Sequence, residues 1–157
     1  MTDSEYEHLA NDPKWRNLDR SVFAEGTLLR YIITAVKNND PKYNQFLLFS
    51  CIRDSVFLVP CKLKSEDDPV VKGNLIPADL TNAAGTKYLP IFSSEAQTGG
   101  KFDDFPHHVA MSFDDCVDIA RQVGMDIVMD AFTGQLTIPM SLAEKILTIP
   151  TRIKEDA

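Results

Sequence analysis

Ser93 and Ser94 are adjacent hydroxyl-bearing residues, and His107 and His108 follow them along the chain. A serine beside an imidazole base is the arrangement of nucleophilic catalysis, so one hypothesis is a small serine hydrolase or transferase that uses Ser93 or Ser94 with His107 or His108. The sequence around the serines lacks the G-x-S-x-G elbow that holds a catalytic serine on a strained turn. A Ser-Ser-Glu run after a strand is instead typical of a helix N-cap. We therefore assign no catalytic residue, and the sequence favours a protein that is not an enzyme.

The same serine pair is the expected ligand site. Backbone N–H groups at a helix N-terminus can hold a small anion, and the predicted N-cap would supply such groups. Two aromatic residues precede the serines on the same strand. We therefore expect any small ligand to bind at Tyr88, Phe92, Ser93 and Ser94.

The two histidines also raise the possibility of a metal site. Adjacent side chains on a strand point to opposite faces, so His107 and His108 cannot both ligate one ion. His108 could join Cys116 or an aspartate, but no CxxC or HxxxH spacing supports this. Asp114 and Asp118 lie one helical turn apart and could chelate a hard cation, although solvated acids account for them better. We predict no metal and no cofactor.

The chain is acidic, with 16 Lys and Arg against 23 Asp and Glu and a net charge of −7. Nucleic-acid binding needs clustered basic residues, and anionic membranes repel an acidic surface, so we expect neither as a partner. The acidic excess is greatest between residues 101 and 130. An alternative hypothesis is therefore an acidic adaptor that meets a basic protein partner through Asp103, Asp104, Asp114 and Asp118.

The 157 residues fit one domain. We expect a loosely structured lead-in at residues 1–18, a single domain at 19–150 and a polar tail at 151–157. The acidic N-terminus is unlike a signal peptide, and the longest apolar stretch is far shorter than the ~20 residues of a membrane helix. Three cysteines inside apolar patterns indicate buried thiols in a reducing compartment. We therefore expect a cytoplasmic protein.

Hydrophobic spacing in the first half of the domain predicts one helix and one hairpin. The helix begins at Asp19 or Ser21, ends near residue 38 and lays its apolar stripe on a core, while its outward face carries Arg30, Thr34 and Lys37. Two short apolar runs, residues 46–49 and 56–59, are typical of buried strands and should pair around a tight turn. Pro60 cannot donate to a ladder, so it should lie at an edge or a bulge.

The second half predicts an alternation of strands and helices. Its elements are an exposed charged loop at 64–73, a hairpin of 74–80 with 87–93, a strand at 107–111, a helix from Ser112 to Gly124, a strand pair at 125–130 and 135–139, and a helix from Ser141 to about Thr148. This order predicts an α+β fold with one mixed, mostly antiparallel sheet built from hairpins, on which the helices pack. A parallel pair between the 107–111 and 125–130 strands is possible.

The segment Gly-Thr-Lys-Tyr-Leu-Pro-Ile-Phe-Ser-Ser, residues 85–94, resembles the signature of the SseB-like family (enhanced serine sensitivity). The resemblance covers roughly residues 46–149 and implies a small bacterial α/β domain, linked by name to serine tolerance, with no agreed catalytic residues. Family members usually end a later strand in Asn-Pro, where this chain has Asp130 and Ala131. The leading hypothesis is a non-enzymatic domain that binds an unknown protein or small-molecule partner.

Overall fold

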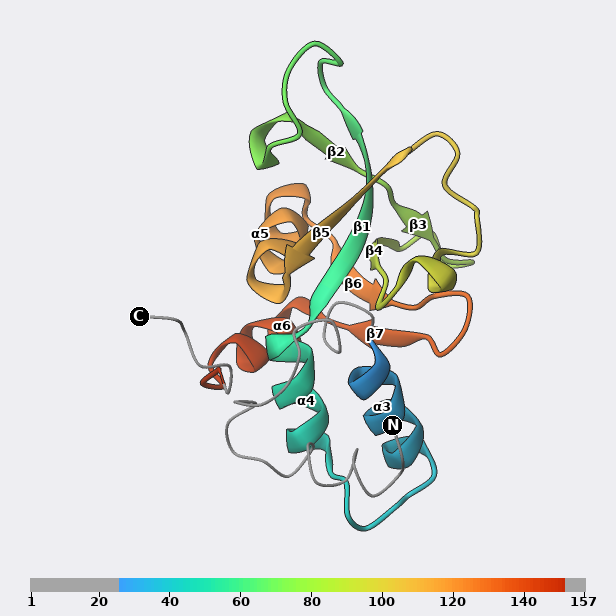
Figure 1. Ribbon diagram of the computed structural model, residues 1–157, viewed down its shortest axis with the longest axis vertical. Helices are drawn as coiled ribbons and strands as arrows, with labels where there is room; N and C mark the ends of the chain where they lie inside the picture. The colour runs from blue at the N-terminus through green and yellow to red at the C-terminus, as the bar shows by residue number, and fades with distance from the viewer. Residues whose placement is uncertain (1–25, 152–157) are drawn as a thin grey trace.

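The computed structural model describes residues 26–151, so the predicted lead-in, the predicted start of the first helix and the tail beyond residue 151 lie outside the described residues. Its helices are α3 (Thr27–Lys37), α4 (Gln45–Asp54), α5 (Phe113–Val123) and α6 (Met140–Leu147), with two 3-10 helices, η1 (Lys72–Asn74) and η2 (Glu95–Thr98). Its strands are β1 (Val56–Leu63), β2 (Leu75–Pro77), β3 (Leu80–Thr81), β4 (Lys87–Ile91), β5 (His107–Ser112), β6 (Asp126–Met129) and β7 (Leu136–Ile138). Figure 1 shows α3 and α4 at one end of the molecule and the loop between β1 and β2 at the other.

The elements form an α+β fold, as predicted, but with two sheets in place of one. The first sheet has the order β2-β1-β5 and is antiparallel throughout. The second has the order β3-β4-β6-β7, in which β4 and β6 run parallel and the outer pairs run antiparallel. The parallel pair considered for the 107–111 and 125–130 strands does not form, because β5 pairs with β1 and β6 pairs with β4.

The division between the sheets falls at Pro60 of β1. On one side of this strand, residues 61–63 pair with β2, whereas Leu58 forms an isolated bridge to Phe92, just beyond β4. Pro60 lies between these partners and has no N–H to continue a ladder, although its carbonyl accepts the Ala78 N–H at 2.8 Å. The predicted edge or bulge at Pro60 is therefore wrong: β1 is the central strand of its sheet, and its neighbour on this side changes at the proline.

Residues 46–49 lie in helix α4, so both the predicted strand and its hairpin with residues 56–59 are wrong. Asn44 begins the helix, because its side-chain oxygen accepts the Leu47 N–H at 2.9 Å. Buried residues recur along α4 at helical spacing, while Phe46 is 59% exposed. A short apolar run fits a buried strand and a buried helix equally well, and here the N-cap favours the helix.

The predicted second hairpin is confirmed only near its turn. Leu80 of β3 lies opposite Tyr88 of β4, and the Asn82 side chain accepts two backbone N–H groups in the turn at 3.0 and 2.9 Å. The rest of the predicted hairpin is wrong, because β2, which lies in the predicted 74–80 strand, pairs with β1 in the other sheet. The loop at residues 64–73 is largely exposed, as predicted.

From α5 to β7 the chain follows its local sequence signals closely. Ser112 caps α5 by accepting a first-turn N–H at 3.3 Å, and Gly124 ends the helix at a φ of 70°. Strands β6 and β7 form the predicted antiparallel pair. The predicted cap of the last helix at Ser141 is wrong, because α6 begins one residue earlier and the Asp126 carboxylate accepts the Met140 N–H at 2.8 Å.

One large apolar core lies among α3, α4, α5, α6 and the two sheets, and it includes the part of the predicted apolar stripe that falls within α3. A smaller cluster of Ala78, Phe92 and Phe102 packs beside it. The three cysteines are buried free thiols inside these apolar regions. Among residues 26–151, every helix is too short or too polar to cross a membrane.

Candidate functional site

Ser93 and Asp130 meet at one edge of the second sheet. Strands β4 and β6 are parallel, so their carboxyl ends lie side by side, and Ser93 follows the first as Asp130 follows the second. The Asp130 carboxylate accepts the Ser93 backbone N–H at 2.8 Å and the Ser93 hydroxyl at 2.7 Å. Both residues are buried, with exposed fractions of 1% and 4%. We call this pair of hydrogen bonds the Ser93–Asp130 clamp.

The backbone around the clamp is tightly constrained. Asp130 adopts a φ of 49°, in the left-handed region that aspartate tolerates better than most residues. Its own N–H donates to the Ile91 carbonyl at 3.0 Å, which continues the β4–β6 pairing by one step. On the other side of Ser93, a Cβ added to Gly26 would lie 2.5 Å from the Ser93 carbonyl oxygen. The start of α3 therefore approaches Ser93 more closely than any residue except glycine allows.

Arg30 of α3 joins the same site. Its Nη1 atom lies 3.2 Å from the Ser94 hydroxyl oxygen and 3.5 Å from that of Ser93. Ser94 stands at the N-cap position of η2, as predicted, but its hydroxyl accepts no bond from the η2 backbone. The Ser94 hydroxyl therefore contacts the Arg30 guanidinium and makes no capping bond to η2.

An open pocket of about 450 Å³ lies along the outer face of α3. Its lining comes from one face of the helix and the turn that follows: Thr27, Arg30, Tyr31, Thr34, Ala35, Asn38 and Asp40. Arg30 therefore belongs to the wall of the pocket and also reaches the hydroxyl of Ser94. The carboxyl edge of parallel strands is a frequent position for ligands. Arg30 links that edge to a pocket that a ligand can enter.

The four residues of the predicted ligand site are not all brought together. Ser93 and Ser94 lie at the carboxyl end of β4 with Arg30. Phe92 is fully buried and stacks against Phe132 with ring centroids 6.1 Å apart, so it supports the site from within the small apolar cluster. Tyr88 is half-buried near the other end of β4, away from the serines.

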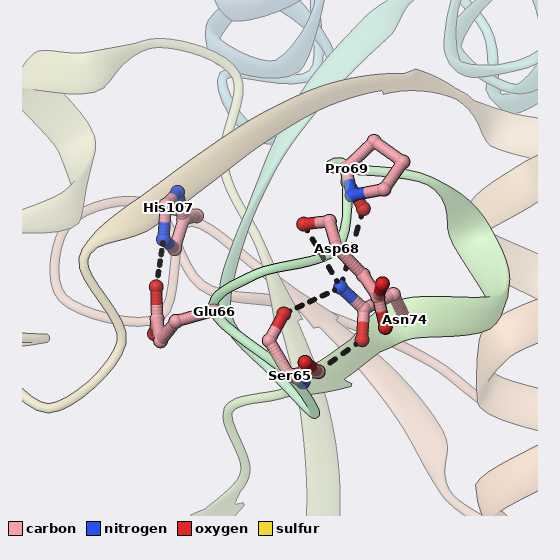
Figure 2. Close-up of polar contacts among 6 residues, drawn as sticks. All are labelled: Ser65, Glu66, Asp68, Pro69, Asn74 and His107. Carbon is pink, nitrogen blue, oxygen red and sulfur yellow. Dashed lines mark hydrogen bonds and ion pairs between the residues drawn. The ribbon is translucent and has the colours of Figure 1, made fainter.

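The two histidines contact acids on different segments, Glu66 in the loop after β1 and Glu95 of η2. His107 Nε2 lies 3.9 Å from the Glu66 carboxylate, and His108 Nδ1 lies 2.6 Å from that of Glu95. Figure 2 shows His107 directed at Glu66, beside a loop whose interior is filled by the Asn74 amide. The loop from Ser65 to Asn74 is closed by that amide, which accepts the Ser65 N–H at 3.0 Å and donates to three loop carbonyls. The hydroxyl of Ser93 donates to a carboxylate instead of an imidazole.

The acids considered for a partner or a cation lie on exposed surfaces. Asp114 pairs with Arg53 at 2.8 Å, and Asp118 lies 3.5 Å from Arg121 on the same helix. Asp103 and Asp104 are exposed in the loop before β5. Within residues 26–151, no three His, Cys, Asp or Glu side chains gather in a way that could hold a metal ion. Cys116, considered as a ligand partner for His108, is fully buried in α5.

Sequence reasoning did not identify Arg30 or Asp130 as site residues. Arg30 lies on the outward face of its helix, as predicted, but nothing in the sequence brings that face to the serines. Asp130 carried one signal, since the resemblance to SseB-like proteins implies an asparagine at the end of this strand, where this chain has Asp130. Both side chains tolerate the left-handed conformation and can accept the Ser93 N–H, which gives the position a structural meaning.

Comparison with known proteins identifies the family. The SseB protein N-terminal domain matches residues 29–142, a segment that contains Arg30, the 85–94 signature and Asp130. No curated protein and no solved structure matches the chain. Because the family match spans most of the sequence, the chain belongs to the SseB family.

Proposed function

We propose that this SseB-like domain is a non-enzymatic binding module that takes a small carboxylate-bearing ligand in the pocket on α3. The observation that carries the proposal is the position of Arg30, whose guanidinium lies in the pocket wall and 3.2 Å from the Ser94 hydroxyl. A guanidinium presents five N–H donors in a fixed plane, a geometry that matches the two oxygens of a carboxylate. We expect Ser94 to contact the same ligand as Arg30.

The state of Ser93 supports binding over catalysis. A serine nucleophile must be exposed to substrate and must give its proton to a base during the reaction. Ser93 is 1% exposed, and its hydroxyl donates to a carboxylate that also accepts the Ser93 backbone N–H. Such a serine fixes the chain at the end of β4. The open position falls to Ser94, whose neighbour is a cation and not a general base.

Isothermal titration calorimetry with acetate, longer carboxylates and matched amides tests the proposal. Carboxylates should bind saturably, and Arg30→Gln should weaken binding about tenfold or more, because one charge-assisted hydrogen bond contributes on the order of 1.5–3 kcal/mol. Lys37→Gln is the control, since it removes a cation from the same helix whose ammonium group contacts the Gly134 carbonyl. If carboxylates and amides bind alike, or Arg30→Gln changes nothing, the proposal is wrong.

The two alternative hypotheses are tested separately. A serine hydrolase or transferase would turn over substrates in an esterase and phosphatase screen and lose that activity in Ser94→Ala. An acidic adaptor would hold a basic protein at low salt and release it as salt rises, with the loss reduced in a variant lacking Asp103 and Asp104. Neither result is expected if the pocket on α3 is the functional site.

We also propose that the module works in the cytoplasm. Cys51, Cys61 and Cys116 are buried free thiols, which suits a reducing compartment where thiols persist without pairing. Expression in a reducing cytoplasm and in an oxidising compartment tests this, and the protein should accumulate folded in the cytoplasm. Equal yield and stability after export to an oxidising compartment would remove the argument from the cysteines.

A further inference from the structure

We infer that the outer edge of β5 binds an extended segment of a basic protein, which adds to the first sheet as a further strand. This goes beyond the proposed function, because β5 contributes no residue to the pocket on α3. Strand addition of this kind draws its affinity from main-chain hydrogen bonds. With six residues, β5 is the longest strand at a sheet edge in the described part of the chain.

The hydrogen bonds of β1 show which main-chain groups of β5 face outward. Leu58 exchanges two bonds with Phe92, at 2.8 and 2.9 Å, so its N–H and carbonyl point away from β5. These groups alternate in direction along an antiparallel strand, so those of Val59 point toward β5. The register places Val59 opposite Val109 and Leu58 opposite Ala110. The groups of Val109 therefore face β1, and those of Ala110 face outward.

The outer edge of β5 is open to a partner strand. By the same alternation, the main-chain groups of His108 face outward together with those of Ala110. Within residues 26–151, these groups have no hydrogen-bond partner, and Ala110 is exposed. Lysine, proline and bulges protect many sheet edges, but β5 contains neither residue and its pairing with β1 is continuous. Two alternate residues thus offer donors and acceptors to a further strand.

The charges around β5 favour a basic partner. Between residues 101 and 118 the chain has five aspartates against one lysine. Asp103 and Asp104 are exposed just before the strand, and Asp114, which pairs with Arg53 at 2.8 Å, lies just after it. A strand added to β5 brings its own flanking residues toward these acids, so lysine or arginine there is attracted. Such charges select the partner and speed its association, while main-chain bonds hold it.

A second copy of the chain is the occupant that these charges disfavour. Antiparallel pairing of two β5 strands would bring the acids before one strand toward the acids after the other. Parallel pairing would bring the same acids of both copies together. Both arrangements set like charges side by side, which is destabilising.

The two faces of β5 indicate the sequence of a suitable probe. Val109 and Met111 pack on the large apolar core, whereas Ala110 and Ser112 are exposed. A strand beside β5 continues both faces, so its residues should alternate between apolar and polar. The probe is therefore a synthetic peptide, blocked at both ends, in which valine and threonine alternate between two terminal lysines.

Surface plasmon resonance with the full chain tests the inference. The peptide should bind, and N-methylation of its central residues should weaken binding about tenfold or more, because it removes main-chain donors and leaves the charge unchanged. A peptide with glutamate in place of lysine should associate about tenfold more slowly at low salt. These comparisons change only the peptide. If the parent peptide does not bind, if N-methylation changes nothing, or if both charge forms associate equally fast, the inference is wrong.

Ala110→Pro tests the edge from the side of the protein. Proline removes an outward N–H and leaves the bonds between β5 and β1 in place, and it should weaken the peptide about tenfold or more. Thr81→Pro is the matched control. The Asn82 N–H donates to the Thr86 carbonyl, so the Thr81 N–H faces away from β4 at the edge of the other sheet. Unchanged affinity in Ala110→Pro, or equal losses in both variants, would overturn the inference.

Raised salt separates strand addition from attraction by charge alone. Association should slow as salt screens the acids, whereas the dissociation rate should change by less than about twofold, because main-chain bonds are screened little. Rapid release at raised salt would show that charge alone holds the peptide and would overturn the inference. A dimer of the unaltered protein that Ala110→Pro converts to a monomer would overturn it too, because a second copy would then occupy the edge.

Discussion

Replacing Asp130 by alanine removes both hydrogen bonds of the Ser93–Asp130 clamp. The carboxylate accepts the Ser93 N–H at 2.8 Å and the Ser93 hydroxyl at 2.7 Å, and both residues are buried. Each bond to a charged group contributes about 1.5–3 kcal/mol, and a buried donor left without an acceptor adds its desolvation cost. Alanine also tolerates the φ of 49° poorly, at about 1 kcal/mol. We therefore expect Asp130→Ala to lower the free energy of unfolding by about 4 kcal/mol.

Two further variants separate the contributions to that loss. Asp130→Asn keeps a residue that tolerates the left-handed region and keeps an oxygen for the Ser93 N–H, so it should cost only about 1 kcal/mol. Ser93→Ala removes the hydroxyl bond but leaves the backbone bond, and should cost about 2 kcal/mol. Because Ser93→Ala and Asp130→Ala remove the same hydroxyl bond, the double variant should be more stable than the sum of the single losses predicts.

Urea unfolding followed by circular dichroism measures these differences, provided that the slope of the transition stays constant among the variants. The order of stability should be wild type, Asp130→Asn, Ser93→Ala and Asp130→Ala. A loss below about 1 kcal/mol for Asp130→Ala would refute the clamp, because a buried residue with two such bonds cannot be removed so cheaply. Equal losses for Asp130→Asn and Asp130→Ala would show that backbone bonding at Ser93 contributes nothing.

Three other predictions test the surroundings of the site. Gly26→Ala should lower the free energy of unfolding more than Gly124→Ala by about 1–3 kcal/mol. Both glycines have a positive φ, but only at Gly26 would a Cβ lie 2.5 Å from another backbone atom. Equal losses of thermal stability would contradict the close approach of Gly26 to Ser93. Asn74→Ala should open the 64–73 loop to limited proteolysis while Asn82→Ala, in an exposed turn, leaves that loop resistant. Burial raises the pKa of Cys61 to about 12, so at pH 8 a variant with Cys61 as its only thiol should resist iodoacetamide until it is unfolded. The contribution of the protonated Cys61 thiol to the free energy of unfolding is fully present below pH 9 and declines as pH rises toward 12. Rapid alkylation of the folded variant would contradict this.

Local signals predicted the segment from α5 to β7 well. Helix α5 could be predicted because its cap, its apolar face and its terminal glycine are all within a dozen or so neighbouring positions. Strands β6 and β7 likewise adjoin in sequence, and the turn between them specifies their antiparallel pairing. Each of these elements depends on contacts that one short segment of sequence contains.

The first half shows where such signals are insufficient. Residues 46–49 are apolar throughout, so neither the helical nor the strand period is visible in them, and the cap at Asn44 was not recognised. Once this segment is assigned to a strand, β1 receives the wrong partner. The actual partners of β1 are β2 and β5, and the pairing with β5 joins residues far apart in sequence. Pairing of that kind is decided by the whole fold and not by a local turn.

The residues of the candidate site could also be predicted only in part. Ser93 and Ser94 could be singled out, because a polar pair directly after a buried strand is visible in the sequence. Their partners could not, since Arg30 comes from α3 and Asp130 from the end of β6. The parallel pairing of β4 with β6 brings Asp130 to Ser93, whereas the position of α3 brings Arg30 to the serines, and no local pattern predicts either.

The register of that parallel pair links the stability of the fold to the proposed binding site. Ile91 lies opposite Met129, so the residues that follow both strands meet in a fixed order and Asp130 comes to face Ser93. The clamp in turn fixes the direction in which the chain leaves β4, and Ser94 is the next residue along it. Arg30 can contact the Ser94 hydroxyl only while that direction is maintained. A change that breaks the clamp should therefore displace the serine from the guanidinium, even though neither Ser93 nor Asp130 lines the pocket.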